Sequence, residues 1–336
     1  MNKLNASGMV LVTGGTGFLG AYVIRELVAS GYAVRAIRRE TPIPFFLPRD
    51  IADRVEWVHC DIRDPMGLEE AMTGAEGVVH AAAKVSFSRK ERRELWSINI
   101  EGTANVVNTA LSLGIRRLVY VSSVAAIGRT GGNEPVTEDR TWQDSRYNTN
   151  YAISKYHGEM EVWRAIGEGL AAVIVNPGTI LGFGDWNNSS CAIFRSVFNE
   201  FPWYTEGING FVDVSDTAKA IVRLLQMDIS GQRYILNADN WSWRQLFETI
   251  AAEFGKRPPA REATPFLAGV AWRAEKIRSL LTGRTALLTR ESARVAASST
   301  RFSNDKFLRL VPDFSFTPLE LSIRTACRSY LQARQP

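Results

Sequence analysis

Cysteine and histidine are both scarce, with three of each in 336 residues. Cys60, Cys191 and Cys327 lie far apart and contain no Cys-x-x-Cys pair, which argues against a disulfide framework. A reducing, cytoplasmic location is therefore expected. The histidines do not have the spacing of metal ligands, so we expect no metal site.

Long apolar runs are also missing, and none approaches the roughly 20 residues that span a bilayer. Residues 1–8 are polar and lack the layout of a signal peptide. The apolar stretch 266–272 is too short to span and is followed by charged residues, so we interpret it as a packed amphipathic helix. The net charge of +5 is mild and the basic residues are scattered, which does not indicate a nucleic-acid-binding stripe. We expect a small-molecule substrate, with neither a membrane nor a nucleic acid as partner.

Apolar strand patterns alternate with helical patterns through the first 180 residues. Strands alternating with helices of this length predict crossover connections, and hence an α/β fold with a parallel sheet. The strands are expected at 9–13, 32–37, 55–60, 77–82, 117–122 and 171–176, and the longest helices at 18–30, 96–113 and 151–168.

A glycine-rich turn joins the first expected strand to the first expected helix. Gly14, Gly17 and Gly20 recur every three residues, and the same stretch satisfies G-x-G-x-x-G. Such glycines allow a tight turn, a close approach of the backbone to a pyrophosphate, and close packing of the helix on the strand. The free N–H groups of the helix N-terminus then bind the pyrophosphate. This context predicts a dinucleotide site that includes Phe18 and Leu19.

The alternation weakens after Gly182. We therefore expect residues 1–182 to form an NAD(P)-binding domain, a Rossmann-type doubly wound parallel sheet, to which a later segment, about 211–240, returns. Residues 183–336 are expected to form a smaller C-terminal α+β substrate lobe, interleaved with the first domain. The segment 41–48 holds three prolines and two phenylalanines and is expected to be a loop near the adenosine end of the cofactor.

The residues at the end of the second strand discriminate between the two nicotinamide dinucleotides. A carboxylate there holds a ribose 2′-hydroxyl, whereas an arginine accommodates a 2′-phosphate. Arg38 and Arg39 favour NADP(H), while Glu40 keeps NAD(H) open.

A tyrosine and a lysine four residues apart open a later helix, which places Tyr151 and Lys155 on one face. A free tyrosine has a pKa of about 10, and a nearby ammonium lowers that pKa by favouring the phenolate. The pair therefore suits general acid–base catalysis between a carbonyl and an alcohol. Ser123 stands at the end of the fifth strand, where it would face the ligand crevice and hydrogen-bond the substrate oxygen.

Taken together, these residues resemble the extended short-chain dehydrogenase/reductase family, which includes nucleotide-sugar epimerases and dehydratases. The resemblance covers nearly the whole chain. The motifs that carry it are Thr13-Gly14-x-x-Gly17-x-x-Gly20, Asp61-Ile62-Arg63-Asp64, His80-Ala81-Ala82-Ala83, Asn99-x-x-Gly102-Thr103, Ser122-Ser123, Tyr151-x-x-x-Lys155 and Asn176-Pro177-Gly178.

The resemblance implies a role for each matching position. Asn99 would join Ser123, Tyr151 and Lys155 in a proton relay. Tyr151 and Lys155 would also contact the cofactor, and Lys155 would hold the nicotinamide ribose. A homodimer through the helices 96–113 and 151–168 is implied as well, although a monomer stays open. The remaining cofactor contacts implied are Asp61 and Ile62 at the adenine, the backbones of Ala81 and Ala82, and Pro177, Gly178, Thr179 and Ile180 beside the nicotinamide carboxamide.

Two departures separate the chain from the nucleotide-sugar members. Residues 207–216 lack the arginine that helps those members to hold a diphosphate, and Ala126-Ile127-Gly128 replaces the usual Val-Tyr-Gly. The pattern Gly31-Tyr32-Ala33-Val34-Arg35-Ala36 with Arg39 looks more like the dihydroflavonol-4-reductase and 3β-hydroxysteroid dehydrogenase branch, which implies hydride transfer at a carbonyl of a small, apolar, often cyclic substrate. The expected substrate contacts are Phe87, Ser123, Phe183 and Trp186.

The expected function is that of an NAD(P)-dependent oxidoreductase with Tyr151 as the general acid/base. One alternative is a nucleotide-sugar epimerase or dehydratase that retains its NAD. A remoter alternative is a cofactor-sensing protein without catalysis, although such proteins commonly lose the tyrosine or the lysine, and this chain has both. Neither the substrate nor the direction of the reaction follows from the sequence.

Overall fold

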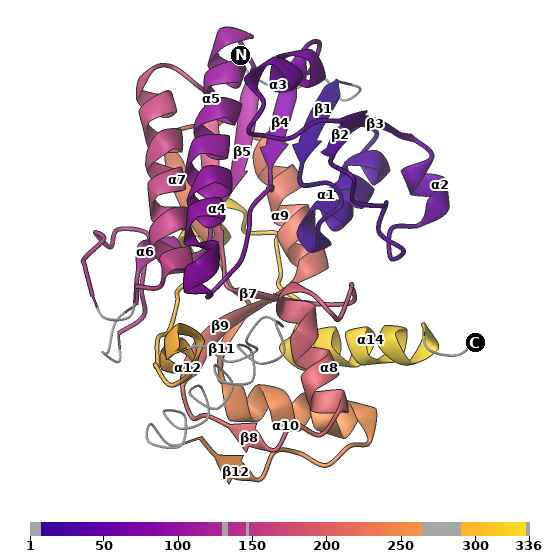
Figure 1. The fold of residues 1–336 in the computed structure, drawn as a ribbon, viewed down its shortest axis with the longest axis vertical. Coiled ribbons are helices and arrows are strands. Elements are labelled where there is room, and N and C mark those ends of the chain that lie inside the picture. Colours follow the sequence, from indigo (N-terminus) through magenta and orange to yellow (C-terminus); the bar gives the residue numbers. More distant parts are fainter. Residues whose placement is uncertain (1–7, 130–133, 146–147, 264–289, 334–336) are drawn as a thin grey trace.

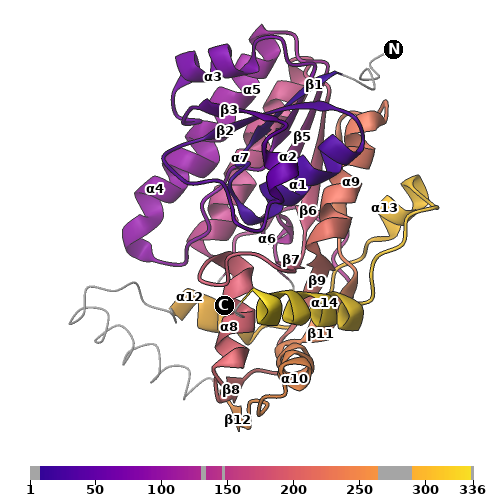
Figure 2. The same cartoon turned by 90° about the vertical axis from the view of Figure 1, so that its right-hand side faces the viewer.

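The computed structural model describes residues 8–129, 134–145, 148–263 and 290–333. The helix expected at 266–272 lies outside these residues. Two lobes are visible, a larger one built around a sheet and a smaller one of short strands and helices (Figures 1 and 2). Within the described ranges, no helix combines the length and the apolar character needed to cross a membrane.

A seven-stranded sheet forms the centre of the larger lobe. Its order is β10-β6-β5-β4-β1-β2-β3, and all neighbouring strands are parallel. This is the order of a dinucleotide-binding doubly wound sheet with one further strand, β10, at an edge. The predicted α/β class is confirmed. The strands are β1 (Met9–Thr13), β2 (Ala33–Arg38), β3 (Val55–His59), β4 (Gly77–His80), β5 (Arg117–Val121), β6 (Ala172–Pro177) and β10 (Gln232–Leu236).

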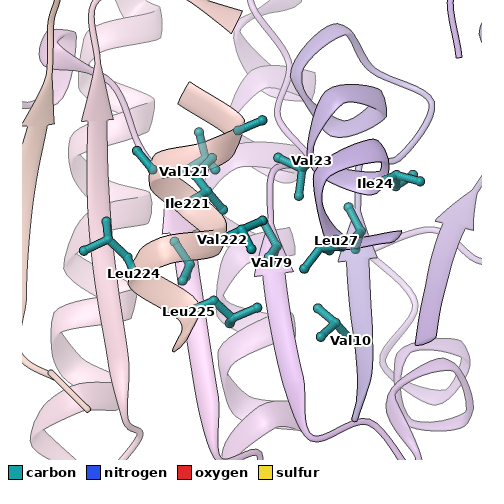
Figure 3. Close-up of a cluster of buried hydrophobic side chains, with 14 of the residues drawn as sticks. Val10, Val23, Ile24, Leu27, Val79, Val121, Ile221, Val222, Leu224 and Leu225 are labelled. Atoms are coloured by element: carbon teal, nitrogen blue, oxygen red, sulfur yellow. The ribbon is translucent and has the colours of Figure 1, made fainter. Parts of the chain in front are cut away.

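Helices cover both faces of this sheet because each presents an apolar stripe at helical spacing. On one face, Val23 and Leu27 of α1 (Phe18–Ala29) and Ile221 of α9 (Val214–Gln226) pack on the strands (Figure 3). Burying one such side chain contributes about 1.5–3 kcal/mol. The other face is covered by α3 (Pro65–Met72), α5 (Gly102–Ser112) and α7 (Asn150–Gly167).

The helix expected at 96–113 is built differently. It starts as α4 (Arg92–Trp96), widens into a π-helical turn, η2 (Ser97–Glu101), and continues as α5. π-Helical turns within α-helices occur frequently at functional sites. Asn99, one of the expected relay residues, lies in this turn.

The smaller lobe contains two small sheets with helices around them. In the first, β9 pairs in parallel with β7 and antiparallel with β11, and in the second β8 pairs with β12. The chain leaves this lobe after β9 to form α9 and β10 in the larger lobe, and then returns. The remaining elements are α2 (Arg49–Ala52), η1 (Arg89–Glu91), α6 (Val124–Ile127), β7 (Thr179–Leu181), η3 (Ser189–Cys191), α8 (Ala192–Phe198), β8 (Trp203–Tyr204), β9 (Ile208–Asp213), β11 (Asp239–Ser242), α10 (Trp243–Phe254), β12 (Arg261–Glu262), α12 (Arg290–Ala296), α13 (Asp305–Leu310) and α14 (Leu319–Gln332).

Candidate active site

A cleft of about 1930 Å³ extends from the glycine turn to aromatic residues of the smaller lobe. It lies at the carboxyl ends of the parallel strands, which is where doubly wound sheets bind their ligands. Every residue assigned to the cofactor from the sequence lines it, namely Gly14, Gly17, Phe18, Leu19, Gly20, Arg38, Arg39, Asp61, Ile62, Ala81, Ala82, Tyr151, Lys155, Pro177, Gly178, Thr179 and Ile180.

The glycine turn leaves no room for side chains. Gly14 has a φ of +72°, and a Cβ atom there would lie 2.7 Å from the backbone nitrogen of Ala82. A Cβ on Gly20 would lie 2.1 Å from the carbonyl oxygen of Gly14. Helix α1 begins beyond Gly17 without a side-chain cap, so its first N–H groups are available to an anion. This cradle fits the pyrophosphate of a dinucleotide.

The ionised side chains at the expected adenosine end of the cleft differ in their partners. The Asp61 carboxylate accepts a hydrogen bond of 2.7 Å from Arg63, which holds the pKa of Asp61 below its usual range, and it lies 3.9 Å from Arg39. Glu40 pairs instead with His59 at 2.9 Å, largely in solvent. Within the described ranges Arg38 forms no ion pair and lines the cleft.

Two local turns bring Ser123 and Tyr151 together. Ser123 follows β5 and caps α6, accepting a hydrogen bond from the backbone N–H of Ala125 at 3.1 Å. Tyr151 stands in the first turn of α7, whose cap is Thr149. Both side chains line the cleft, close enough for the Ser123 hydroxyl to influence the titration of Tyr151. Burial raises the pKa of Tyr151, and the neighbouring Ser123 hydroxyl opposes that rise.

Lys155 lies one turn further along α7 and is almost fully buried. Its Nζ donates a 2.7 Å hydrogen bond to the carbonyl oxygen of Val121 and lies 4.6 Å from the centre of the Tyr120 ring. Burial lowers the pKa of Lys155 to about 7, and the negative charge of Glu159 opposes that shift. The charge on this amine is therefore sensitive to any other charge placed in the cleft.

A buried carboxylate stands behind this lysine. Glu159 accepts hydrogen bonds from Ser122 at 2.7 Å, from Asn176 at 2.9 Å and from Arg233 at 3.0 Å. Glu159 is not among the site residues predicted from the sequence. A signal was present, because Glu159 follows Lys155 by four residues and shares its helix face.

Asn99 is buried behind the cleft. Its Nδ2 donates to Ser154 Oγ at 2.9 Å and to the carbonyl oxygen of Lys84 at 2.9 Å, while its Oδ1 accepts from the Lys84 backbone N–H at 2.8 Å. It thus joins the π-helical turn to α7. A part for Asn99 in a proton relay stays a prediction.

The expected substrate contacts divide into two pairs. Phe87 and Ser123 line the cleft, and the Phe87 ring lies 6.2 Å from that of Tyr151. Phe183 and Trp186 do not line it, contrary to expectation. Their rings pack on Tyr330 of α14 at 4.9 and 5.4 Å, partly buried against the core of the smaller lobe. The aromatic residues of the smaller lobe that line the cleft are instead Phe201, Trp203, Tyr204, Trp243 and Phe247.

His80 ends β4 beneath the cleft and is fully buried. Its Nδ1 lies 2.7 Å from Thr13 Oγ1, and its Nε2 lies 3.0 Å from Thr103 Oγ1. Burial, with a smaller contribution from Lys155, lowers the pKa of His80 to about 3. The folded protein therefore holds this imidazole neutral.

This neutral histidine makes stability depend on pH. Below pH 6.5 the unfolded chain binds a proton on His80 that the folded chain does not, so stability falls as pH decreases from 6.5 toward 3. The expected decrease in the free energy of unfolding is about 1.4 kcal/mol for each pH unit. Urea unfolding of the wild type and of His80→Gln at several pH values measures it, since glutamine keeps a donor and an acceptor but does not titrate. Equal pH slopes in the two proteins would contradict the prediction.

Comparisons with known proteins agree with this geometry. The model of the NAD dependent epimerase/dehydratase family matches residues 10–237. The chain belongs to this family.

Individual members resemble most of the chain. It is 32% identical over 302 residues to a putative dihydroflavonol 4-reductase of Synechocystis sp., across 88% of this chain and 87% of that protein. It is 31% identical over 317 residues to sterol demethylase protein B of Methylococcus capsulatus, across 90% and 93% of the two chains. The crystal structure of gox2253 superposes with a TM-score of 0.82 at 28% identity, across 98% and 99%.

These relatives confirm the predicted family. They also confirm the prediction that the protein is an NAD(P)-dependent oxidoreductase.

Proposed function

We propose that this protein interconverts a carbonyl and a secondary alcohol on a small, largely apolar cyclic substrate by hydride transfer. The observation that carries the proposal is that Ser123 and Tyr151 lie together in the lining of the cleft, with Lys155 one helical turn away. The aromatic residues of the smaller lobe that line the same cleft support an apolar substrate. So do the names of two relatives, which refer to a dihydroflavonol and to a sterol.

Each of the three side chains has a separate task in this proposal. Tyr151 holds the proton at its Oη and exchanges it with the substrate oxygen. Ser123 donates a hydrogen bond to the same oxygen and stabilises the charge that develops on it. The Lys155 ammonium favours the Tyr151 phenolate and so counteracts the rise in the tyrosine pKa that burial causes. When bound, the nicotinamide ring supplies or accepts the hydride.

We also propose that NADP(H) is the preferred cofactor. Arg38 and Arg39 both line the cleft, where a 2′-phosphate on the adenosine ribose would meet them. Glu40, the carboxylate that would favour NAD(H), is engaged by His59 outside the cleft lining.

A substrate screen tests both proposals. Ketones, flavanonols, sterol ketones and nucleotide sugars are incubated with NADPH or NADH while the absorbance of the reduced cofactor is followed. We expect net oxidation of the cofactor with a ketone of one of the first three classes, and tighter binding of NADPH than of NADH to the free protein. Conversion of a nucleotide sugar without net cofactor oxidation would contradict the proposed reaction. Tighter binding of NADH would contradict only the cofactor preference.

A further inference from the structure

Arg129 lines the cleft but has no part in the function proposed above. It follows α6, six residues after Ser123, and its side chain is partly exposed. It belongs neither to the glycine turn and adenosine end nor to the group of Ser123, Tyr151 and Lys155.

The contacts of Arg129 place it at the substrate end. Its Nη2 donates to Asn209 Oδ1 at 3.1 Å, and its Nη1 lies 3.4 Å from Ser298 Oγ. Asn209 in turn donates to Thr179 Oγ1 at 2.8 Å. The guanidinium therefore lies beside β9 and close to β7, where the expected nicotinamide contacts meet the smaller lobe.

A guanidinium carries five N–H donors, and these two contacts use two of them. The other donors of Arg129 have no acceptor among the residues that the structure describes.

The charge of this guanidinium is also unpaired within the described ranges. By contrast, Lys84, another cation of the cleft, pairs with both Glu91 at 3.2 Å and Glu94 at 2.5 Å. Burial lowers the pKa of Arg129 to about 10, so it still carries its charge at neutral pH. A partly desolvated cation without a counter-charge is costly, and a ligand anion would remove that cost.

We propose that Arg129 binds a carboxylate of the substrate, so that the protein acts on apolar compounds that carry one acidic group. This proposal rests on the proposed function, because it concerns the substrate of the same site. The two oxygens of a carboxylate match two parallel N–H donors of one guanidinium. A diphosphate carries more negative charge than one guanidinium balances, and residues 207–216 supply no further arginine or lysine.

Binding measurements test this inference without any need for turnover. The probes are phenylacetate, 3-phenylpropanoate and 4-phenylbutanoate, each with its neutral primary amide, together with phenyl phosphate and inorganic diphosphate. Titration calorimetry is carried out on the protein saturated with NADP⁺. We expect at least one acid to bind about ten- to hundredfold more tightly than its amide, as a charge-assisted hydrogen bond provides.

The variants identify the group responsible. Arg129→Gln should abolish the preference for the acid, and Arg129→Lys should retain part of it because the charge remains. Arg195→Gln is the matched control, since Arg195 also lines the cleft but donates to Asn187, and it should keep the preference. Unchanged NADP⁺ affinity shows that each variant is folded.

Three results would overturn the inference: equal binding of every acid and its amide, a preference that survives in Arg129→Gln, or tighter binding of either phosphate probe. If neutral ketones are reduced while no acid is preferred, the inference fails and the proposed function stands. If acids bind through Arg129 but neither the ketones of the screen nor a keto acid of the preferred length is reduced with NADPH, the proposed reaction fails instead.

Discussion

Replacing Tyr151 by phenylalanine should lower kcat/KM by about 10²–10⁴-fold, the range that general acid–base catalysis contributes. The variant loses the Oη atom that exchanges the proton, but it keeps the ring that packs near Phe87. Cofactor affinity should therefore change little. Steady-state rates with any substrate from the screen, together with fluorescence titration of NADPH, measure the two quantities separately.

Tyr156→Phe is the matched control for this variant. Tyr156 lies on the same helix, but its ring stacks on Trp142 at 4.4 Å and is outside the cleft lining. It should keep the turnover of the wild type. Wild-type turnover in Tyr151→Phe would refute the role of the hydroxyl, and an equal loss in both variants would point to damage to α7.

Gly20→Ala should abolish measurable cofactor binding and destabilise the fold. Alanine is the better helix former by about 1 kcal/mol. That gain is outweighed, because the new Cβ would lie 2.1 Å from the carbonyl oxygen of Gly14, a backbone atom that cannot rotate away. Overpacking of this kind costs about 1–3 kcal/mol and would displace α1 from β1, and with it the N–H groups that face the pyrophosphate.

Gly167→Ala provides the control within another helix. Gly167 is the last residue of α7, and a Cβ there would meet no atom within 4 Å. This variant should bind cofactor normally and gain up to about 1 kcal/mol in the free energy of unfolding. Urea unfolding and NADPH titration of both variants give the comparison. Normal cofactor affinity in Gly20→Ala would show that α1 can shift without affecting the turn.

The cofactor side of the cleft could be predicted because its determinants are local. A strand, three spaced glycines and a helix follow one another within residues 9–29, and Tyr151 and Lys155 share one helical turn. Local spacing fixes the geometry of such groups, whatever the rest of the chain does.

The substrate side could not be predicted in the same way. Phe183 and Trp186 follow strand ends that face the crevice, yet their positions depend on Tyr330, far along the chain. Arg129 likewise acquires its place only when Asn209 and Ser298 come beside it. Contacts between residues so far apart in the sequence depend on how the smaller lobe is assembled. Spacing along the sequence does not specify that assembly.

The π-helical turn at 97–101 illustrates a finer limit. Its sequence suits an ordinary α-helix, and the expected range 96–113 continued through it without a break. The turn accompanies the hydrogen bonds that Asn99 makes with the Lys84 backbone. Those contacts, rather than helix propensity, distinguish this turn from a regular helix.

The position of β10 at the edge of the large sheet has a consequence for biosynthesis. The strand that covers β6 is encoded after β7, α8, β8 and β9 of the smaller lobe. A nascent chain must therefore make part of the second lobe while the edge of β6 is still uncovered, and an open strand edge invites pairing with other chains. The interval between the synthesis of β6 and that of β10 is the period in which this protein would most depend on a chaperone.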